Sequence, residues 1–234
     1  FLGPMILDPA SQMVDLQYFG GQETLLRLQN FLDSGATPAY VGWGSMPADV
    51  AFLVKAIVAL KMNKLRAIVV GGWAKLSEQK VKDFVEQTMP DDPMGVLDYA
   101  REHILFVEVA PHEWLFQRCL FTLHHGGAGT TQAALRAGVP TILSPFSFDQ
   151  FQFADWVTDL GVGIKIGLLD NPDKLMDPQW SKAFRLCAND KAMRQRSKEF
   201  AEVIKKERGA HTLVEHFKES LKPREEGKKK TFGF

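Results

Sequence analysis

The sequence predicts an α/β domain built on a Rossmann-like parallel sheet with helices on both faces. Short apolar runs alternate along the chain with longer segments whose apolar residues recur at helical spacing. Several of the short runs end in glycine-rich turns. In a parallel sheet such turns gather at the carboxyl edge of the strands, which is where ligands bind.

The N-terminal half is predicted to alternate helix and strand. Leucine, valine and phenylalanine at intervals of three or four residues indicate the helices, and short runs that end in glycine indicate the strands. Ser77 is expected to cap the third helix. The predicted elements are a helix around 25–32, a strand at 39–43, a helix at 48–60, a strand at 67–70 and a helix after Ser77.

The C-terminal half continues the same pattern. The helix that follows the central glycine turn is expected to end at Gly138 in the C-cap position, with Pro140 just beyond it. An edge-like strand and three final helices are expected to complete the domain. The predicted elements are strands at 104–107 and 120–123, a helix at 130–137, a strand at 141–143, a helix at 150–160, a strand at 162–166 and helices whose last two cover 191–206 and 211–221.

The domain is expected to cover 19–221, between a linker at 1–18 and a charged tail at 222–234 that is predicted to be disordered. The tail includes a lysine run at 228–230, interpreted as solvated. The opening residues, Phe1-Leu2-Gly3-Pro4, read like the middle of a chain. We therefore expect the sequence to belong to a longer protein.

Composition excludes several classes of function. The formal net charge is zero, so no long-range field would recruit nucleic acid or an anionic membrane. No apolar run approaches the roughly 20 residues that span a bilayer. Cys119 and Cys187 lie in apolar segments without metal-ligand spacing, which favours buried free thiols and a cytoplasmic location.

The most informative segment is the turn from His124 to Thr131. A strand that leads through a glycine-rich turn into a helix places free backbone N–H groups around an anion, and no P-loop lysine follows. This pattern predicts that a diphosphate is held without being hydrolysed, with an imidazole N–H from His124 as a further donor. The alternative is a turn that only packs tightly. The residues expected to hold the diphosphate are His124, Gly126, Gly127, Ala128, Gly129 and Thr130.

Other turns contribute weaker signals. Asp149 and Gln150 follow a strand and suit sugar hydroxyls, although Asp149 could equally cap a helix. Gly44-Ser45 could reach a phosphate, and the segment from Val109 to His112 could form the wall of a base pocket. Gly72-Trp73 is a weaker signal of a site, because Trp73 could equally be a packing residue. His125 is interpreted as structural, and neither metal-ligand spacing nor a nucleophile elbow is found.

These motifs resemble the UDP-glycosyltransferases of the GT-B fold, in which two Rossmann-like halves face each other across a cleft. The segments 111–116 (PHEWLF), 135–140 (LRAGVP) and Pro145-Phe146 before Asp149-Gln150-Phe151 are similar to sterol 3-beta-glucosyltransferases. The resemblance covers the chain from Phe1 to about Leu221. It identifies the chain as the C-terminal, donor-binding half.

The resemblance implies a role for each matching residue. His124 and the backbone of 127–130 would hold the diphosphate and stabilise the leaving group, with help from Ser45. Gln132 would contact ribose, and Asp149 with Gln150 would hold glucose. Plant relatives have a tryptophan that stacks on uracil at the position of Val109, and a glutamine at the position of His112. This chain departs at both positions, so the resemblance leaves base recognition to the backbone around Val109, with His112 as a weaker candidate.

The resemblance also implies partners. The donor would be UDP-glucose and the acceptor a sterol or a similar lipophilic alcohol, with neither a metal nor another cofactor. The acceptor pocket and the catalytic base would belong to an N-terminal half, and so would any membrane contact. The reaction would be an inverting glucosyl transfer.

Three alternatives remain open at this point. The first is a nucleotide-sugar epimerase of the same architecture. The second is a donor-binding subunit that works with a separate partner. The third is a degenerate nucleotide-binding module, against which the intact His124 and Asp149-Gln150 argue.

Overall fold

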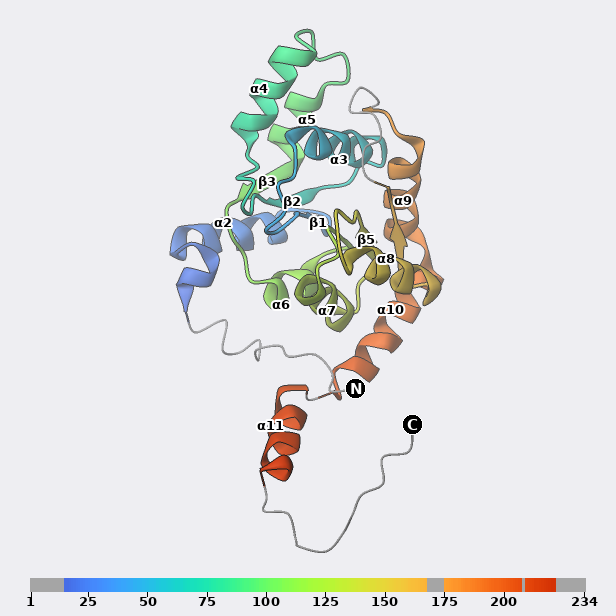
Figure 1. Ribbon diagram of the computed structural model, residues 1–234. Coiled ribbons are helices and arrows are strands. Elements are labelled where there is room, and N and C mark those ends of the chain that lie inside the picture. Colours follow the sequence, from blue (N-terminus) through green and yellow to red (C-terminus); the bar gives the residue numbers. More distant parts are fainter. Residues whose placement is uncertain (1–14, 168–174, 208, 222–234) are drawn as a thin grey trace, which may run out of the picture.

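The computed structural model describes residues 15–167, 175–207 and 209–221 (Figure 1). The predicted tail at 222–234 and most of the predicted linker lie outside these residues. The end of the linker forms a short 3-10 helix, η1 (Leu16–Phe19), which closes at Gly20 in the left-handed conformation.

The described strands form one parallel sheet, which confirms the predicted fold class. The order across the sheet is β3-β2-β1-β4-β5-β6. The order reverses between β1 and β4, and such a switch point opens a crevice at the carboxyl edge. The strands are β1 (Ala39–Val41), β2 (Ala67–Val70), β3 (Ile104–Val107), β4 (Thr122–His124), β5 (Thr141–Leu143) and β6 (Gly163–Lys165).

Helices cover both faces of the sheet (Figure 1). Two short helices were not predicted, α5 and α6, because each is too short to show a helical period in the sequence. The helices are α2 (Gln22–Asp33), α3 (Val50–Met62), α4 (Glu78–Thr88), α5 (Val96–His103), α6 (His112–Leu115), the 3-10 helix η2 (Phe116–Arg118), α7 (Ala128–Ala137), α8 (Gln150–Asp159), α9 (Pro178–Asn189), α10 (Lys191–Ile204) and α11 (Gly209–Ser220). Among the described helices, none has the length and apolar character that crossing a bilayer requires.

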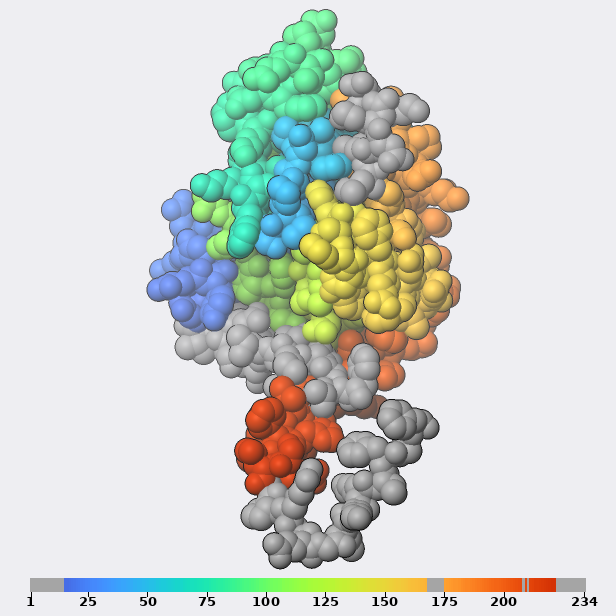
Figure 2. All heavy atoms as spheres, in the orientation of Figure 1, coloured from blue at the N-terminus to red at the C-terminus, as the bar shows by residue number. Residues whose placement is uncertain are grey.

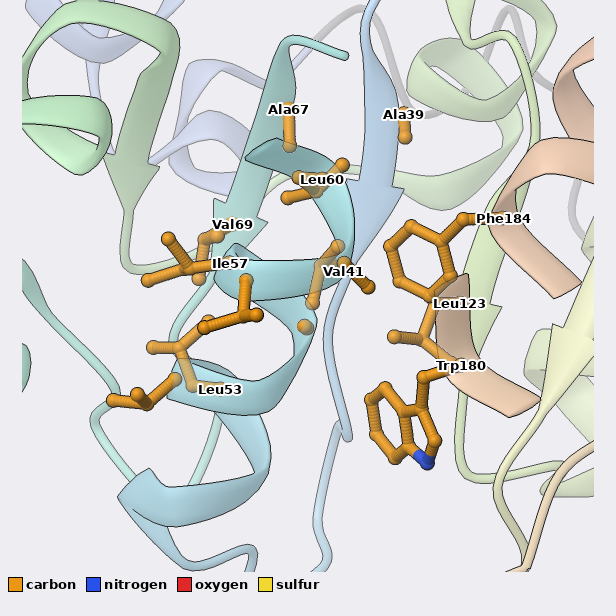
Figure 3. Packing of buried hydrophobic residues seen from close by; sticks show 14 of the residues in the cluster. Ala39, Val41, Leu53, Ile57, Leu60, Ala67, Val69, Leu123, Trp180 and Phe184 are labelled. Carbon is orange, nitrogen blue, oxygen red and sulfur yellow. The ribbon is translucent and has the colours of Figure 1, made fainter. Parts of the chain in front are cut away.

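The core divides into layers because successive strand residues point to opposite faces. Val41 and Val69 point toward α3 and α9, where Phe184 joins them in the cluster of Figure 3. Tyr40 and Ile68, one residue away on the same strands, pack in the opposite layer. Apolar side chains therefore cover both faces of the sheet, which leaves the edge where the strands end as the place for a ligand site.

Some helix starts are closed by a capping side chain, and others, including that of α7, are not. Asp49, Asp177 and Asp190 cap α3, α9 and α10, and Ser77 caps α4 as predicted. Helix α7 begins after Gly127 with no side-chain cap. Its first-turn N–H groups have no acceptor inside the helix, so this end is open to a ligand.

Candidate functional site

A cleft of about 410 Å³ lies where the loops after β4, β1, β2 and β3 meet. These loops come from both sides of the point where the strand order reverses. The lining residues are Gly44, Ser45, Val70, Gly72, Trp73, Glu108, Val109, Ala110, His112, His125, Gly127, Ala128, Gly129 and Thr130.

The N-terminus of α7 forms one end of the cleft. Helix α7 begins at Ala128, two residues earlier than predicted, so Ala128, Gly129 and Thr130 supply its first-turn N–H groups. A Cβ built on Gly129 meets nothing within 4 Å, which leaves open space beside this turn. The helix dipole adds partial positive charge at the same end. The arrangement suits a doubly charged oxyanion.

His125 is one of two histidines that line this cleft. Only 6% of its surface is exposed, and its Nδ1 atom has no hydrogen-bond partner. Its ring lies against Gly44 and Gly127, since a Cβ at Gly44 would be 2.9 Å from its Cε1 atom and a Cβ at Gly127 would overlap Nε2. A buried polar atom without a partner is costly, so it calls for an explanation. His125 was expected to be structural, and the structure places it in the lining of the cleft.

His124 is fully buried in β4, and the structure contradicts its predicted contact with a diphosphate. Its Nδ1 atom accepts a hydrogen bond from the Gly126 N–H (3.1 Å), and its Nε2 atom pairs with the Thr141 hydroxyl (2.9 Å). Both ring nitrogens are therefore occupied inside the protein. The reason is that β4 extends one residue beyond its predicted end, which places His124 in the sheet and His125 in the turn.

His112 lines the cleft from the start of α6. Its Nε2 atom lies 3.2 Å from the hydroxyl of Tyr40, and its ring stacks on Phe116 with centroids 4.7 Å apart. Burial, with a smaller contribution from the neighbouring His125, lowers the pKa of His112 to about 4. Burial also lowers the pKa of His124 and of His125, although Asp149 raises the latter. All three imidazoles are neutral donors or acceptors at pH 7.

The loops after β1 and β2 are joined at the middle of the cleft. The Trp73 N–H donates to the carbonyl oxygen of Gly44 (2.9 Å). Gly44 and Gly72 both have left-handed φ angles, of 59° and 57°. The sequence assigned Gly44 and Ser45 to the site. Trp73 was weighed against a packing role and not assigned to the site. Glu108 was missed, although it comes directly after a strand, which is the signal that could have found it.

The segment after β5 gives Asp149 and Gln150 different roles. Asp149 is exposed, and its side chain makes no cap hydrogen bond, so the capping alternative is not what the structure shows. Gln150 is buried, and its Oε1 atom accepts from the N–H groups of Phe146 (2.8 Å) and Ser147 (3.2 Å). Its amide nitrogen lies 3.3 Å from the sulfur of Met46. Gln150 therefore holds the loop, and Asp149 is the residue available to a ligand.

Two further predicted residues lie outside the lining of the cleft. Gly126, with a φ angle of 90°, turns the chain out of β4 and donates to His124. Gln132 is half-buried in α7. Within 15–167, 175–207 and 209–221, no group of three His, Cys, Asp or Glu residues could hold a metal ion.

The buried histidines predict that acid destabilises the fold. A histidine with a lowered folded-state pKa contributes its full stability above the unfolded value of 6.5 and loses it as the pH falls toward the folded value. His112 alone should lower the free energy of unfolding by on the order of 1 kcal/mol per pH unit as the pH falls from 6.5 toward about 4. The midpoint temperature of thermal unfolding should fall from pH 7 to pH 6 and pH 5. It should fall less steeply in the His112→Gln variant. A constant midpoint would contradict the burial of these rings.

Comparison with known families agrees with this geometry. The family described as "Erythromycin biosynthesis protein CIII-like, C-terminal domain" matches residues 87–216. A sterol 3-beta-glucosyltransferase of Sclerotinia sclerotiorum is 36% identical over 190 residues, which are 80% of this chain and 12% of that protein. One from Candida albicans is 34% identical over 178 residues, or 75% of this chain and 11% of that protein. The chain thus spans about an eighth of the length of these relatives.

Solved structures of glycosyltransferases share the fold. The UDP-glucose:anthocyanidin 3-O-glucosyltransferase in complex with UDP superposes with a TM-score of 0.62 at 19% identity, covering 82% of this chain and 42% of that one. The calicheamicin glycosyltransferase gives a TM-score of 0.60 at 22% identity, covering 82% and 45%.

The fold and the cleft together define one Rossmann-like half of a GT-B protein, with the uncapped N-terminus of α7 at one end of the cleft. The chain belongs to the family of erythromycin biosynthesis protein CIII-like C-terminal domains, with sterol 3-beta-glucosyltransferases among its homologues. The resemblance found in the sequence is confirmed.

Proposed function

We propose that this chain is the donor-binding domain of an inverting glycosyltransferase. We propose a UDP-sugar as its ligand, and specifically UDP-glucose. The observation that carries the proposal is the uncapped N-terminus of α7 beside His125, whose buried Nδ1 atom has no partner. These donors meet in one cleft with the loops after β1, β2 and β3. An extended ligand with an anionic centre fits this distribution.

The diphosphate would lie against the first turn of α7. The N–H groups of Ala128, Gly129 and Thr130 and the ring of His125 would donate to its oxygens, and the Ser45 hydroxyl would approach from the loop after β1. When the glycosidic bond breaks, negative charge grows on the leaving diphosphate. Donors fixed before the reaction stabilise that charge without reorganising, so we propose that no metal ion is needed.

The two ends of the donor would point in opposite directions from this centre. The carboxylate of Asp149 is exposed, and in this proposal it would accept hydrogen bonds from sugar hydroxyls. The base would extend toward Val109 and Ala110 after β3. Gln150, which is turned inward, would act by holding the loop that carries Asp149.

In our proposal, the complete reaction also needs groups from outside this chain. A base in an N-terminal half would deprotonate the acceptor hydroxyl, which attacks the anomeric carbon as UDP leaves. We propose a sterol or a similar lipophilic alcohol as acceptor, because the sterol 3-beta-glucosyltransferases match most of this chain. A cytoplasmic location, with membrane contact made by other parts of the protein, is proposed on the same basis.

Calorimetric titration of the chain with UDP and UDP-glucose, first without metal and then with magnesium, tests the proposal. We expect saturable binding of both ligands that magnesium does not change. His125→Ala should weaken it, and Thr158→Ala on α8 should serve as a control with unchanged affinity.

Absence of binding by the folded chain and by the full-length protein would overturn the proposal. Binding by the full-length protein alone would mean that another part completes the pocket. Binding only with magnesium would overturn the proposed metal independence and leave the donor class in place.

A further inference from the structure

Trp73 differs from the other tryptophans in its exposure. Trp43, Trp114 and Trp180 are less than 8% exposed, whereas 81% of Trp73 is open to solvent. An indole buries a large apolar area when it packs, so leaving it in water forgoes that stabilisation. Trp73 is also one of the residues that line the cleft.

The backbone that carries Trp73 is held in place. Its N–H donates to the Gly44 carbonyl, and the next turn is closed by the Lys75 N–H, which donates to the carbonyl of Gly72 (3.0 Å). A Cβ on Gly72 would overlap that Gly44 oxygen, so the loops after β1 and β2 are in direct contact. Figure 2 shows the two segments side by side on the surface, in light blue and teal.

The position of Trp73 along the sheet indicates what it meets. The cleft runs from the start of α7, after β4, past the loops of β1 and β2 to Val109 after β3. Neighbouring strands lie about 4.8 Å apart, so three spacings, about 14 Å, separate its two ends. A diphosphate at the start of α7 therefore places the rest of an extended nucleotide beside the loop of Trp73.

We propose that Trp73 stacks on the nucleobase of the donor, an inference that rests on the proposed function. An exposed aromatic ring on a fixed loop offers a flat apolar face at little cost in conformational entropy. Stacking accepts any base, because every base has a π-face. Trp73 thus contributes affinity, and the edges of the base are read by other groups, such as the backbone of Val109 and Ala110.

The test compares two ligands on the same protein: UDP, which carries a base, and inorganic pyrophosphate, which does not. Trp73→Ala should weaken UDP binding at least about fivefold and up to about a hundredfold, the range measured for base–aromatic stacking. Pyrophosphate should bind the variant and the wild type equally well. Trp73→Phe, which keeps a ring, should retain most of the affinity for UDP.

Fluorescence adds a direct readout. UDP should quench the indole emission of the wild type and of Trp156→Phe, which removes the other exposed tryptophan (45%). It should not quench Trp73→Phe. Thermal unfolding checks that each variant is folded. Because Trp73 is exposed, we expect its substitution to leave the fold intact.

The outcomes separate the two proposals. A wild type that binds neither UDP nor pyrophosphate, both as this chain and as the full-length protein, overturns the proposed function and this inference with it. A wild type that binds both, together with a Trp73→Ala variant that binds UDP unchanged, overturns the inference and leaves the function standing. Equal affinity of the wild type for UDP and pyrophosphate also overturns it, because the base then adds nothing.

Discussion

Replacing His125 by alanine should weaken UDP binding by about 10- to 100-fold while the fold survives. A hydrogen bond to a charged group is worth about 1.5–3 kcal/mol, and the Nδ1 atom of His125 has no other partner. Removing it takes away a donor and relieves an unsatisfied buried atom at once, so stability should change by about 1 kcal/mol or less. In a complete enzyme the same change should lower kcat by about 100- to 1000-fold, as for the loss of an oxyanion donor.

His124→Ala should do the reverse. The ring is fully buried, and its loss leaves the Gly126 N–H and the Thr141 hydroxyl without this partner. We expect about 3 kcal/mol of destabilisation. Chemical unfolding of both variants beside UDP titration measures the contrast. Normal UDP binding by His125→Ala, with His124→Ala stable but unable to bind, would contradict the assignment and restore the original prediction for His124.

The sheet and its main helices could be predicted from the sequence because their signals are local. Strands such as β2 and β5 are apolar runs bounded by glycine or proline. Helix α10 buries one face at helical spacing, and α3 is a longer apolar segment that is buried on nearly all sides. The short helices α5 and α6 lack such a period. Helix α5 begins after Gly95 in the left-handed conformation, where its first N–H groups bond the carboxylate of Asp92. That contact depends on the loop geometry and has no clear pattern in the sequence.

The glycine turn could be predicted, but the assignment of its two histidines could not. A strand alternates faces at every residue, so an error of one residue at the end of β4 exchanges the roles of His124 and His125. Alternation offered one signal. Thr122 and His124 share a face of β4, and both contact the Thr141 hydroxyl, whereas Leu123 joins the opposite layer. The partner strand was needed to recognise that contact.

Gly72→Ala should be the most damaging small change in the cleft. The φ angle of Gly72 is 57°, which costs a residue with a Cβ about 1–2 kcal/mol. The new Cβ would also overlap the carbonyl oxygen of Gly44, which accepts from Trp73. The loops after β1 and β2 would have to separate. We expect about 2–3 kcal/mol of destabilisation together with a loss of UDP affinity, measured by chemical unfolding and calorimetry.

Gly129→Ala is the matched control, because it adds the same methyl group to the same cleft. Its Cβ meets no atom within 4 Å, and Gly129 lies in the first turn of α7, where alanine is favoured over glycine by up to about 1 kcal/mol. Stability should stay level or rise. A helical Cβ tilts toward the N-terminus of its helix, so this methyl approaches the proposed diphosphate and should still weaken UDP binding. The two variants should thus lose affinity alike while their stabilities move apart. Equal stabilities would mean that the contact between the loops after β1 and β2 is not what constrains Gly72.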